Sequence, residues 1–386
     1  MSSLRILICP QEFKGSLTAA EAARAIAEGV RRALPDADLV EEPTADGGPG
    51  TVELVHAAAG GELIEGLWRG PLGDTAAAVY VLLPDGSAVI EAATTAGLVL
   101  VPEARRDPTA ASTFGVGEQI RDALRRGARR ITVGVGGTGT NDGGAGAAQE
   151  LGLRLLDGAG EALGPGGLEL ARLDRIDHGG GDDVEALLAG AELRVAVDVT
   201  NRLLGDEGAI AIYGPQKGVT PELAPRLEAA LARWAERCRA DLGVEIASAD
   251  GSGAGGGLPA GLIAVAEAGA AGINVESGAV LVGEAIGLPQ QVRDADLVIT
   301  GEGQLDAQTA YGKAVAYVAA LAREAGTPCL VVAGSVAATP ETISDAEAAA
   351  PPDMPLDEAI SRAAELVAAA AERVVGRYID TDKGRS

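Results

Sequence analysis

The chain has 386 residues and a formal net charge of −25, with 56 acidic side chains against 31 Lys and Arg. This balance argues against a nucleic-acid partner and an anionic membrane surface, because both are bound by basic residues. Hydrophobic residues make up 47% and charged residues 23%, which is typical of a globular protein long enough for two domains. We expect small-molecule ligands. An anionic substrate remains possible because distant charges are screened by salt. The oligomeric state does not follow from the sequence.

The three cysteines, Cys9, Cys238 and Cys329, form no CxxC pair, and two of them lie at the ends of apolar runs. We expect buried thiols in a reducing compartment. The apolar stretch near the first residues is too short for a signal peptide. No apolar run reaches the roughly 18 residues that suggest a membrane span. These observations predict a cytoplasmic protein.

The first elements alternate between strand and helix. Residues 5–9 predict a buried strand, 19–34 a helix, and 39–42 a second strand. Thr18 and Glu21 have the spacing of a capping box at the start of that helix. Strand–helix–strand order is typical of a parallel sheet.

The pattern then changes and later returns. Residues 62–68, 77–83 and 87–93 are short apolar or alternating runs separated by turn residues, which predicts an antiparallel meander. Beyond them, helices are expected at 117–125, 144–151, 222–242, 314–325 and 356–374, and strands at 131–135, 193–197, 296–300 and 329–333.

The predicted fold class is α/β, with a Rossmann-like parallel-sheet domain and a second, mixed α/β domain. The first and last strand–helix units look alike. We therefore expect one discontinuous domain, residues 1–60 and 290–386, with residues 61–289 inserted as the other.

Glycine-rich clusters lie where predicted strands end. In open α/β sheets ligands bind outside the carboxyl ends of the strands, where glycines let backbone N–H groups face phosphate oxygens. Several clusters also carry Asp, Asn or Lys. The clusters are KGS at 14–16, ADGGPGT at 45–51, GGTGTNDGGAG at 136–146, YGPQKG at 213–218, GSGAGGG at 251–257 and TGEGQLD at 300–306.

One cluster fits a dinucleotide fingerprint. Gly134, Gly136 and Gly139 satisfy GxGxxG directly after a predicted strand, and Asp157 lies near the end of the next apolar run. The helix should begin within this motif, yet more turn-forming residues follow. A nicotinamide-dependent dehydrogenase is therefore an alternative rather than the main interpretation.

Other catalytic motifs are absent from the sequence. There is no GxxxxGK[ST], no kinase HRD or DFG set and no GxSxG, and His56 and His178 are the only histidines. Zinc sites and Ser-His-Asp triads are therefore disfavoured. Carboxylates, lysines and backbone amides remain, and they suit magnesium-assisted phosphoryl transfer, which needs positioning and charge neutralisation more than covalent chemistry.

At these loops the sequence resembles the bacterial glycerate kinases of the first type, from Ile6 to about Ser335. The resemblance implies ATP-dependent phosphorylation of D-glycerate with Mg²⁺, 2-phosphoglycerate as product, and two α/β domains around an active-site cleft. It is carried by FKGSLTAAE at 13–21, ADGG at 45–48, TNDGGAG at 140–146, YGPQKG at 213–218, AGGGLPAGL at 254–262 and ADLVITGEGQLDAQTAYGKA at 295–314.

The chain departs from the family pattern. Gln11 and Glu12 replace the usual Asp and Ser, and Pro49 replaces a Glu. DVTNRL at 198–203 replaces the usual DVDNPL, and GGTGTND at 136–142 the usual GGSATND. A relative that acts on another small hydroxy acid, or that only binds, is therefore a further alternative.

The expected catalytic residues are Asp198, Lys14 and Asp142. Asp198 would be general base or magnesium ligand, Asp142 a second magnesium ligand, and Lys14 a partner for phosphate or carboxylate. Each also has an ordinary interpretation as a turn residue or a solvated lysine. Attack by the 2-hydroxyl or the 3-hydroxyl is not distinguished. The expected substrate- or nucleotide-binding residues are Ser16, Asp46, Gly47, Gly48, Gly137, Thr138, Asn141, Lys217, Glu302, Asp306 and Lys313.

Overall fold

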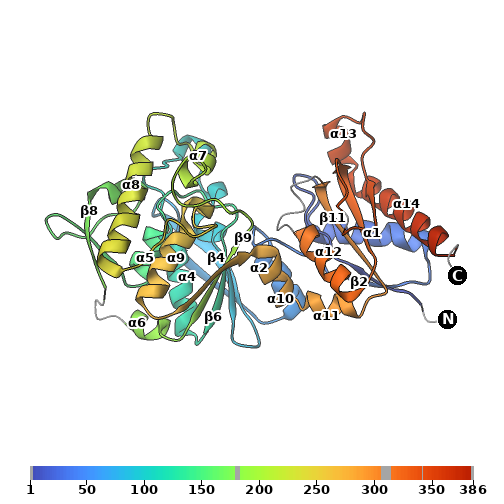
Figure 1. Ribbon diagram of the computed structural model, residues 1–386, viewed down its shortest axis with the longest axis horizontal. Helices are drawn as coiled ribbons and strands as arrows, with labels where there is room; N and C mark the ends of the chain where they lie inside the picture. Colours follow the sequence, from blue (N-terminus) through green and yellow to red (C-terminus); the bar gives the residue numbers. More distant parts are fainter. Residues whose placement is uncertain (1–2, 179–182, 306–313, 341, 384–386) are drawn as a thin grey trace. The chain divides into compact units, whose positions relative to one another are not determined.

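The computed structural model describes residues 3–178, 183–305, 314–340 and 342–383 (Figure 1). Contacts divide the chain into two compact units, Met1–Asp46 with Val282–Ser386, and Gly47–Leu281. Each unit is built on its own sheet, and the α/β class is confirmed. The domain limits expected at residues 60 and 290 stay a prediction.

The first unit contains a five-stranded sheet in the order β13-β12-β11-β1-β2. Every neighbouring pair in it is parallel, as expected for a Rossmann-like unit. Its strands are β1 (Arg5–Ile8), β2 (Asp38–Glu41), β11 (Leu297–Leu305), β12 (Cys329–Val336) and β13 (Asp345–Ala348). Its helices are α1 (Ala19–Ala33), α11 (Leu288–Arg293), α12 (Ala314–Ala325), α13 (Leu356–Ser361) and α14 (Ala363–Lys383), and α10 (Gly278–Ala285) spans the division between the units.

Helices α1 and α14 lie side by side over one face of this sheet (Figure 1). Ile6 and Ile8 alternate with Leu7 along β1 and join the core beneath these helices. The Thr18–Glu21 capping box at the start of α1 is confirmed. The helix expected at 356–374 is interrupted, because Arg362 adopts φ −111° and ends α13 before α14 begins.

The second unit contains a six-stranded mixed sheet in the order β10-β9-β6-β5-β4-β3. Strands β3, β4 and β5 are antiparallel, which confirms the predicted meander, while β5, β6, β9 and β10 run parallel. The strands are β3 (Glu62–Arg69), β4 (Thr75–Leu82), β5 (Ala88–Glu91), β6 (Arg130–Gly134), β9 (Glu192–Val197) and β10 (Gly272–Ser277), and β7 (Arg154–Asp157) and β8 (Leu173–Asp177) form a separate hairpin.

The helices of this unit pack Ile120, Val265 and Trp234 into one core with the sheet residues Ile90 and Val195. The helix expected at 222–242 changes near its end, where α8 continues into a π-helical turn, Cys238–Leu242, that Gly243 ends at φ 73°. The helices are α2 (Thr51–Ala59), α3 (Ala93–Ala96), α4 (Phe114–Arg125), α5 (Ala145–Glu150), α6 (Asp183–Leu188), α7 (Ala209–Tyr213), α8 (Ala224–Arg237) and α9 (Leu258–Ala268).

The three cysteines are free and buried, as predicted. Burial raises the pKa of the Cys9 thiol well above its ordinary value, so it stays protonated and unreactive. Among the described residues, no helix combines the length and apolar character needed to cross a bilayer.

The contact between α1 and α14 gives a stability prediction. A Cβ added to Gly29 in α1 would lie 2.0 Å from the carbonyl oxygen of Ala368 in α14. Gly29→Ala should therefore lower the free energy of unfolding by about 1–3 kcal/mol, the usual effect of overpacking. Denaturant titration followed by circular dichroism measures the change.

Gly376 in α14 provides the matched control, because a Cβ there meets no atom within 4 Å. Gly376→Ala should raise stability by roughly 0.5–1 kcal/mol, since alanine is the better helix former. Equal effects of the two substitutions would contradict close packing at Gly29.

Candidate active site

In the first unit, the expected residues of the KGS cluster form a tight turn between β1 and α1. Phe13 and Leu17 close the turn with a backbone bridge, and Gly15 adopts φ 79°, a conformation that favours glycine. The Ser16 hydroxyl donates to the Phe13 carbonyl at 2.8 Å, so it stabilises the turn. The Lys14 side chain is exposed to solvent and can meet an anion.

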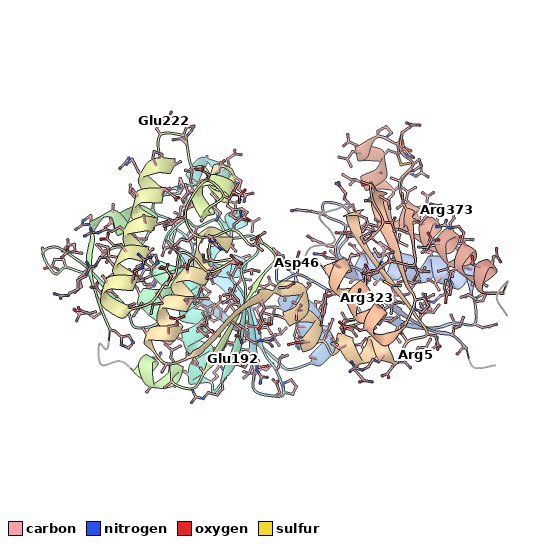
Figure 2. The ribbon with its side chains drawn as sticks, in the orientation of Figure 1. Arg5, Asp46, Glu192, Glu222, Arg323 and Arg373 are labelled. Atoms are coloured by element: carbon pink, nitrogen blue, oxygen red, sulfur yellow. The ribbon has the colours of Figure 1, made fainter. Side chains whose placement is uncertain are left out.

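Asp46 follows β2 and is half-buried (Figure 2). The Gln11 amide donates to its carboxylate at 2.6 Å, and the Gln11 backbone N–H donates to the Gly301 carbonyl on β11. These contacts join the segments that follow β1 and β2 to β11. An acid at position 11, as in the family pattern, would instead face Asp46 with like charge. Glu302 is buried on β11, and Asp306 and Lys313 lie outside the described residues.

In the second unit, Gly47 and Gly48 press against the carboxyl ends of β6 and β9. A Cβ on Gly47 would lie 2.8 Å from the Ala196 Cβ, and one on Gly136 would lie 2.8 Å from the Gly48 Cα. Gly137 accepts a hydrogen bond from the Leu98 N–H at 2.9 Å. Only glycine permits this approach, so the glycines of two separate clusters form one packed layer of backbone.

Asp142 lies within this layer and is wholly buried. Its carboxylate accepts hydrogen bonds from the Thr113 N–H and hydroxyl, at 2.8 and 2.9 Å, and from the Ser112 hydroxyl at 3.2 Å. It also accepts from the N–H groups of Gly144 and Gly146 at the start of α5, each at 3.2 Å. Burial raises the pKa of Asp142, and these hydrogen bonds oppose that shift.

Lys217 is also buried beside this layer, with only 2% of its surface exposed. Its ammonium donates to the Thr140 carbonyl at 2.7 Å, two residues before Asp142. Burial lowers the pKa of Lys217 to about 7, and the negative charge of Asp142 opposes the shift. Gly256 makes room for the contact, because a Cβ there would lie 1.8 Å from the Thr140 oxygen and 2.9 Å from the Lys217 nitrogen.

Two neighbouring polar atoms are buried without a hydrogen-bond partner among the described residues, Thr140 Oγ1 and Asn141 Oδ1. The Asn141 amide nitrogen donates to the Pro108 carbonyl at 3.4 Å. Thr138 is also buried and forms a backbone bridge with Gly97. Buried polar atoms are normally satisfied, so these two oxygens indicate a place where water or a ligand group completes the loop.

Asp198 directly follows β9, at the carboxyl edge of the sheet, and is half-buried. Its carboxylate accepts from the Ser277 hydroxyl at 3.2 Å and from the Gly278 N–H at 3.1 Å. These contacts fix the carboxylate where β9 and β10 end while leaving part of it accessible. This combination suits a residue that meets a ligand.

The expected residues thus separate into two sets. Lys14, Ser16, Asp46 and Glu302 belong to the first unit, and the glycines, Thr138, Asn141, Asp142, Asp198 and Lys217 to the second. Within the described ranges, no three His, Cys, Asp or Glu gather as metal ligands. Magnesium needs only one or two carboxylates together with phosphate oxygens, which Asp198 fits. The Asp142 oxygens accept hydrogen bonds inside the protein, and the expected role of Asp142 as a second magnesium ligand stays a prediction.

Sequence reasoning missed Glu91, the last residue of β5. Only 4% of its surface is exposed, and it accepts a hydrogen bond from the Val52 N–H at 2.6 Å, near the start of α2. Burial raises the pKa of Glu91 to about 7, and the charge of Glu53 adds to the shift. The feature in the sequence that could have indicated Glu91 is its place at the end of the apolar run that forms the strand β5.

The dinucleotide alternative is not supported. After Gly134, Gly136 and Gly139 the chain does not enter a helix until Ala145, whereas the fingerprint needs the helix to begin within the motif.

Comparisons with known proteins identify the family to which the sequence and the fold are similar. The glycerate kinase family model matches residues 6–379. A glycerate kinase of Halalkalibacterium halodurans is 44% identical over 96% of this chain and 97% of its own length. The glycerate 2-kinase of Escherichia coli K12 is 42% identical over 86% of each chain. A crystal structure assigned as glycerate kinase 2 of Salmonella typhimurium LT2 superposes with a TM-score of 0.85 and 40% identity, over 99% of this chain and 100% of that one.

The fold and its glycine-rich strand ends are therefore those of an α/β phosphotransferase. The chain belongs to the glycerate kinase family.

The buried Lys217 ammonium gives a prediction for stability against pH. Between the folded-state pKa of about 7 and the ordinary value of 10.5, the unfolded chain binds a proton that the folded chain does not. The stability contributed by this residue therefore rises with pH across that window, by up to about 1.4 kcal/mol per unit. Lys217→Met should remove this rise.

Both tryptophans, Trp68 and Trp234, lie in the second unit, so their fluorescence during urea unfolding at pH 6.5, 8 and 9.5 reports on it. Lys14→Met, which removes an exposed lysine of the other unit, should leave the pH slope unchanged. If the free energy of unfolding of Lys217→Met rises with pH as steeply as that of the wild type, Lys217 is charged in the folded protein across the whole range from pH 6.5 to 9.5.

Proposed function

We propose that the protein transfers the γ-phosphoryl group of ATP to D-glycerate and forms 2-phospho-D-glycerate. The observation that carries this proposal is the match to the glycerate kinase family over residues 6–379. One relative of similar sequence is a glycerate 2-kinase, which favours the 2-hydroxyl as acceptor. The consumption of ATP also favours a cytoplasmic enzyme.

In the proposed reaction the substrate hydroxyl oxygen bonds to the γ-phosphorus, and the bond from phosphorus to the ADP oxygen breaks. We assign the hydroxyl proton to the Asp198 carboxylate, which is anchored by Ser277 and Gly278 at the end of β9. The backbone of the glycine loops in the second unit stabilises the charge on the phosphate chain. Lys14, which is exposed in the first unit, is the lysine that we propose for a phosphate or carboxylate group.

The alternative role that we propose for Asp198 is to hold Mg²⁺, which when bound neutralises charge on the phosphate oxygens. Asp142 and Lys217 are buried, and we assign them an indirect role. They hold the loop after β6 in the conformation in which its backbone N–H groups face the phosphate chain, and they do not contact the substrate.

A coupled assay for ADP release tests the function. D-Glycerate should support turnover. Chelation of divalent cations should abolish this turnover, and added Mg²⁺ should restore it. ³¹P NMR should show that the product carries its phosphate on the 2-hydroxyl. Release of ADP with another hydroxy acid alone would point to a divergent substrate. No release with any acid, despite ATP binding, would point to a binding-only relative.

Asp198→Asn tests the residue assignment. The amide keeps the shape but accepts no proton, so kcat should fall by about 10²–10⁴-fold, the usual contribution of a general base. The matched control is Asp85→Asn, an exposed aspartate in the turn before β5 at the opposite edge of the same sheet, which should leave kcat unchanged. Equal turnover by Asp198→Asn and the wild type would remove Asp198 from the chemistry.

A further inference from the structure

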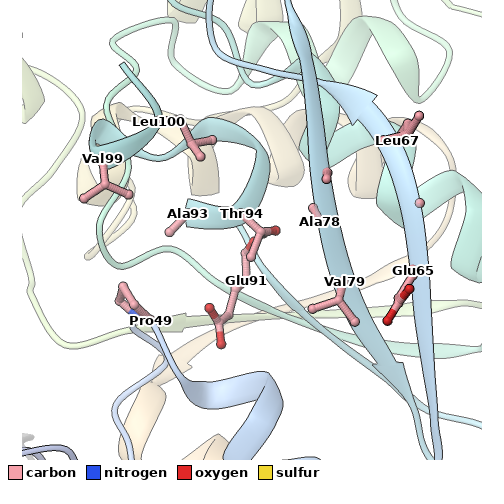
Figure 3. Close-up of a pocket in the computed structure, with 12 residues that line it drawn as sticks. Pro49, Glu65, Leu67, Ala78, Val79, Glu91, Ala93, Thr94, Val99 and Leu100 are labelled. Carbon is pink, nitrogen blue, oxygen red and sulfur yellow. Dashed lines mark hydrogen bonds between the residues drawn. The ribbon is translucent and has the colours of Figure 1, made fainter. Parts of the chain in front are cut away.

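A hollow of about 730 Å³ lies on one face of the meander in the second unit (Figure 3). Glu65 pairs across the strands with Val79, and Leu67 pairs with Ala77, so these side chains share the face that forms the hollow. The alternate pair, Ile64 and Tyr80, is buried in the core on the other face. The strand register itself therefore separates this surface from the core.

The hollow presents large apolar side chains to solvent. Leu67 is 73% exposed, Val99 87% and Leu100 38%, and all three line it. Figure 3 shows Val99 and Leu100 on the segment that faces β4, with Glu91 and Pro49 below them. Contiguous apolar surface of this kind marks a site that binds a ligand or a partner.

The hollow adjoins the glycine loop that follows β6. A Cβ on Gly137 would lie 3.2 Å from Pro49 Cγ and 3.3 Å from Ala93 Cβ, and both of those residues line the hollow. The Leu98 N–H also donates to the Gly137 carbonyl at 2.9 Å. A ligand in the hollow can therefore extend onto the loop without leaving the second unit.

Charge decides which part of a ligand fits. The ionisable side chains that line the hollow are Glu65 and Glu91. The carboxylate of Glu65, and that of Glu91 when it is ionised, repel phosphates and the carboxylate of glycerate. Glycerate carries oxygen on every carbon and so has no apolar surface to bury. A flat, neutral ring with an amino group has the opposite properties, because it buries apolar area and donates hydrogen bonds to a carboxylate.

We propose that this hollow binds the purine base of the nucleotide co-substrate, with the phosphate chain leading toward the glycine loop at Gly136 and Gly137. The proposal rests on the proposed function, since it concerns the same co-substrate. The volume of the hollow, about 730 Å³, lies within the range of roughly 300–1,000 Å³ that is usual for binding sites of small molecules. The amino group of adenine donates a hydrogen bond to a carboxylate there, whereas the carbonyl oxygen that ITP carries at that position has no proton to donate.

Filling the hollow tests the proposal. Val79→Trp occupies it from β4, and we expect the KM for ATP to rise by at least about tenfold, the usual effect of losing an apolar pocket. The KM for glycerate should stay unchanged, and adenosine should compete with ATP only in the wild type. Thr75→Trp is the matched control, because Thr75 is exposed on the same face of β4 and does not line the hollow.

Leu67→Glu, with Leu63→Glu as its control on β3, is a second test that spares the core, since Leu67 is 73% exposed. It should weaken ATP binding by adding a third carboxylate beside the hollow, and the wild type should prefer ATP to ITP. Unchanged KM for ATP in folded Val79→Trp and Leu67→Glu would overturn the proposal. So would a dimer of the wild type that Leu67→Glu dissociates, because a second copy would then cover the hollow.

The two proposals fail in different ways. If adenosine binds the wild type and not Val79→Trp, yet no hydroxy acid is phosphorylated, the nucleotide site stands and the glycerate reaction is wrong. If glycerate is phosphorylated and both substitutions leave the KM for ATP unchanged, the reaction stands and the base binds elsewhere.

Discussion

The loop that follows β6 depends on two buried ionisable side chains, Asp142 and Lys217. The Asp142 carboxylate gathers donors from the segment before α4 and from the start of α5, and the Lys217 ammonium fixes the Thr140 carbonyl two residues earlier. Removing either group would leave buried polar partners unsatisfied, which is a large penalty in a dry interior. These contacts fix the Thr140 carbonyl and the start of α5 through groups of the protein itself. Such preorganisation is what the phosphoryl transfer that we propose needs most from a protein.

Close packing of one backbone segment against another explains why the same loop is rich in glycine. Gly144 lies against Gly261 at the start of α9, where a Cβ would come within 2.8 Å of the Gly261 Cα. Together with the contacts of Gly136 and Gly256, this explains why glycines cluster at the strand ends of a chain that has 55 of them. Asp198, the side chain that we propose for the chemistry, directly follows β9 at the rim of this layer.

Much of the fold could be predicted from local pattern. Apolar runs such as 329–333 indicated buried parallel strands, and the turns before residues 77 and 87 separated the strands of the meander. These signals are local, and so is the capping box at Thr18. The short strands β10 and β13 were missed because their sequences, GINVES and DAEA, carry polar residues or lack bulky apolar ones.

The site was harder to predict, because its contacts are distant in sequence. Thr113 is 29 residues from Asp142, and Lys217 is 77 residues from Thr140. A lysine between glycines resembles a solvated loop residue until the fold buries it. Glu91 was overlooked because its role depends on the start of α2, which packs against β5.

The most direct test of the central claim is a crystal structure of the protein with ADP, Mg²⁺ and D-glycerate. We expect the phosphates on the backbone N–H groups of the glycine loops and Asp198 beside the metal or the acceptor hydroxyl. We also expect Asp142 and Lys217 to keep their internal partners and make no contact with ligand. A metal ion bound to the Asp142 carboxylate, or a phosphate bound to the Lys217 ammonium, would contradict a supporting role for the buried pair.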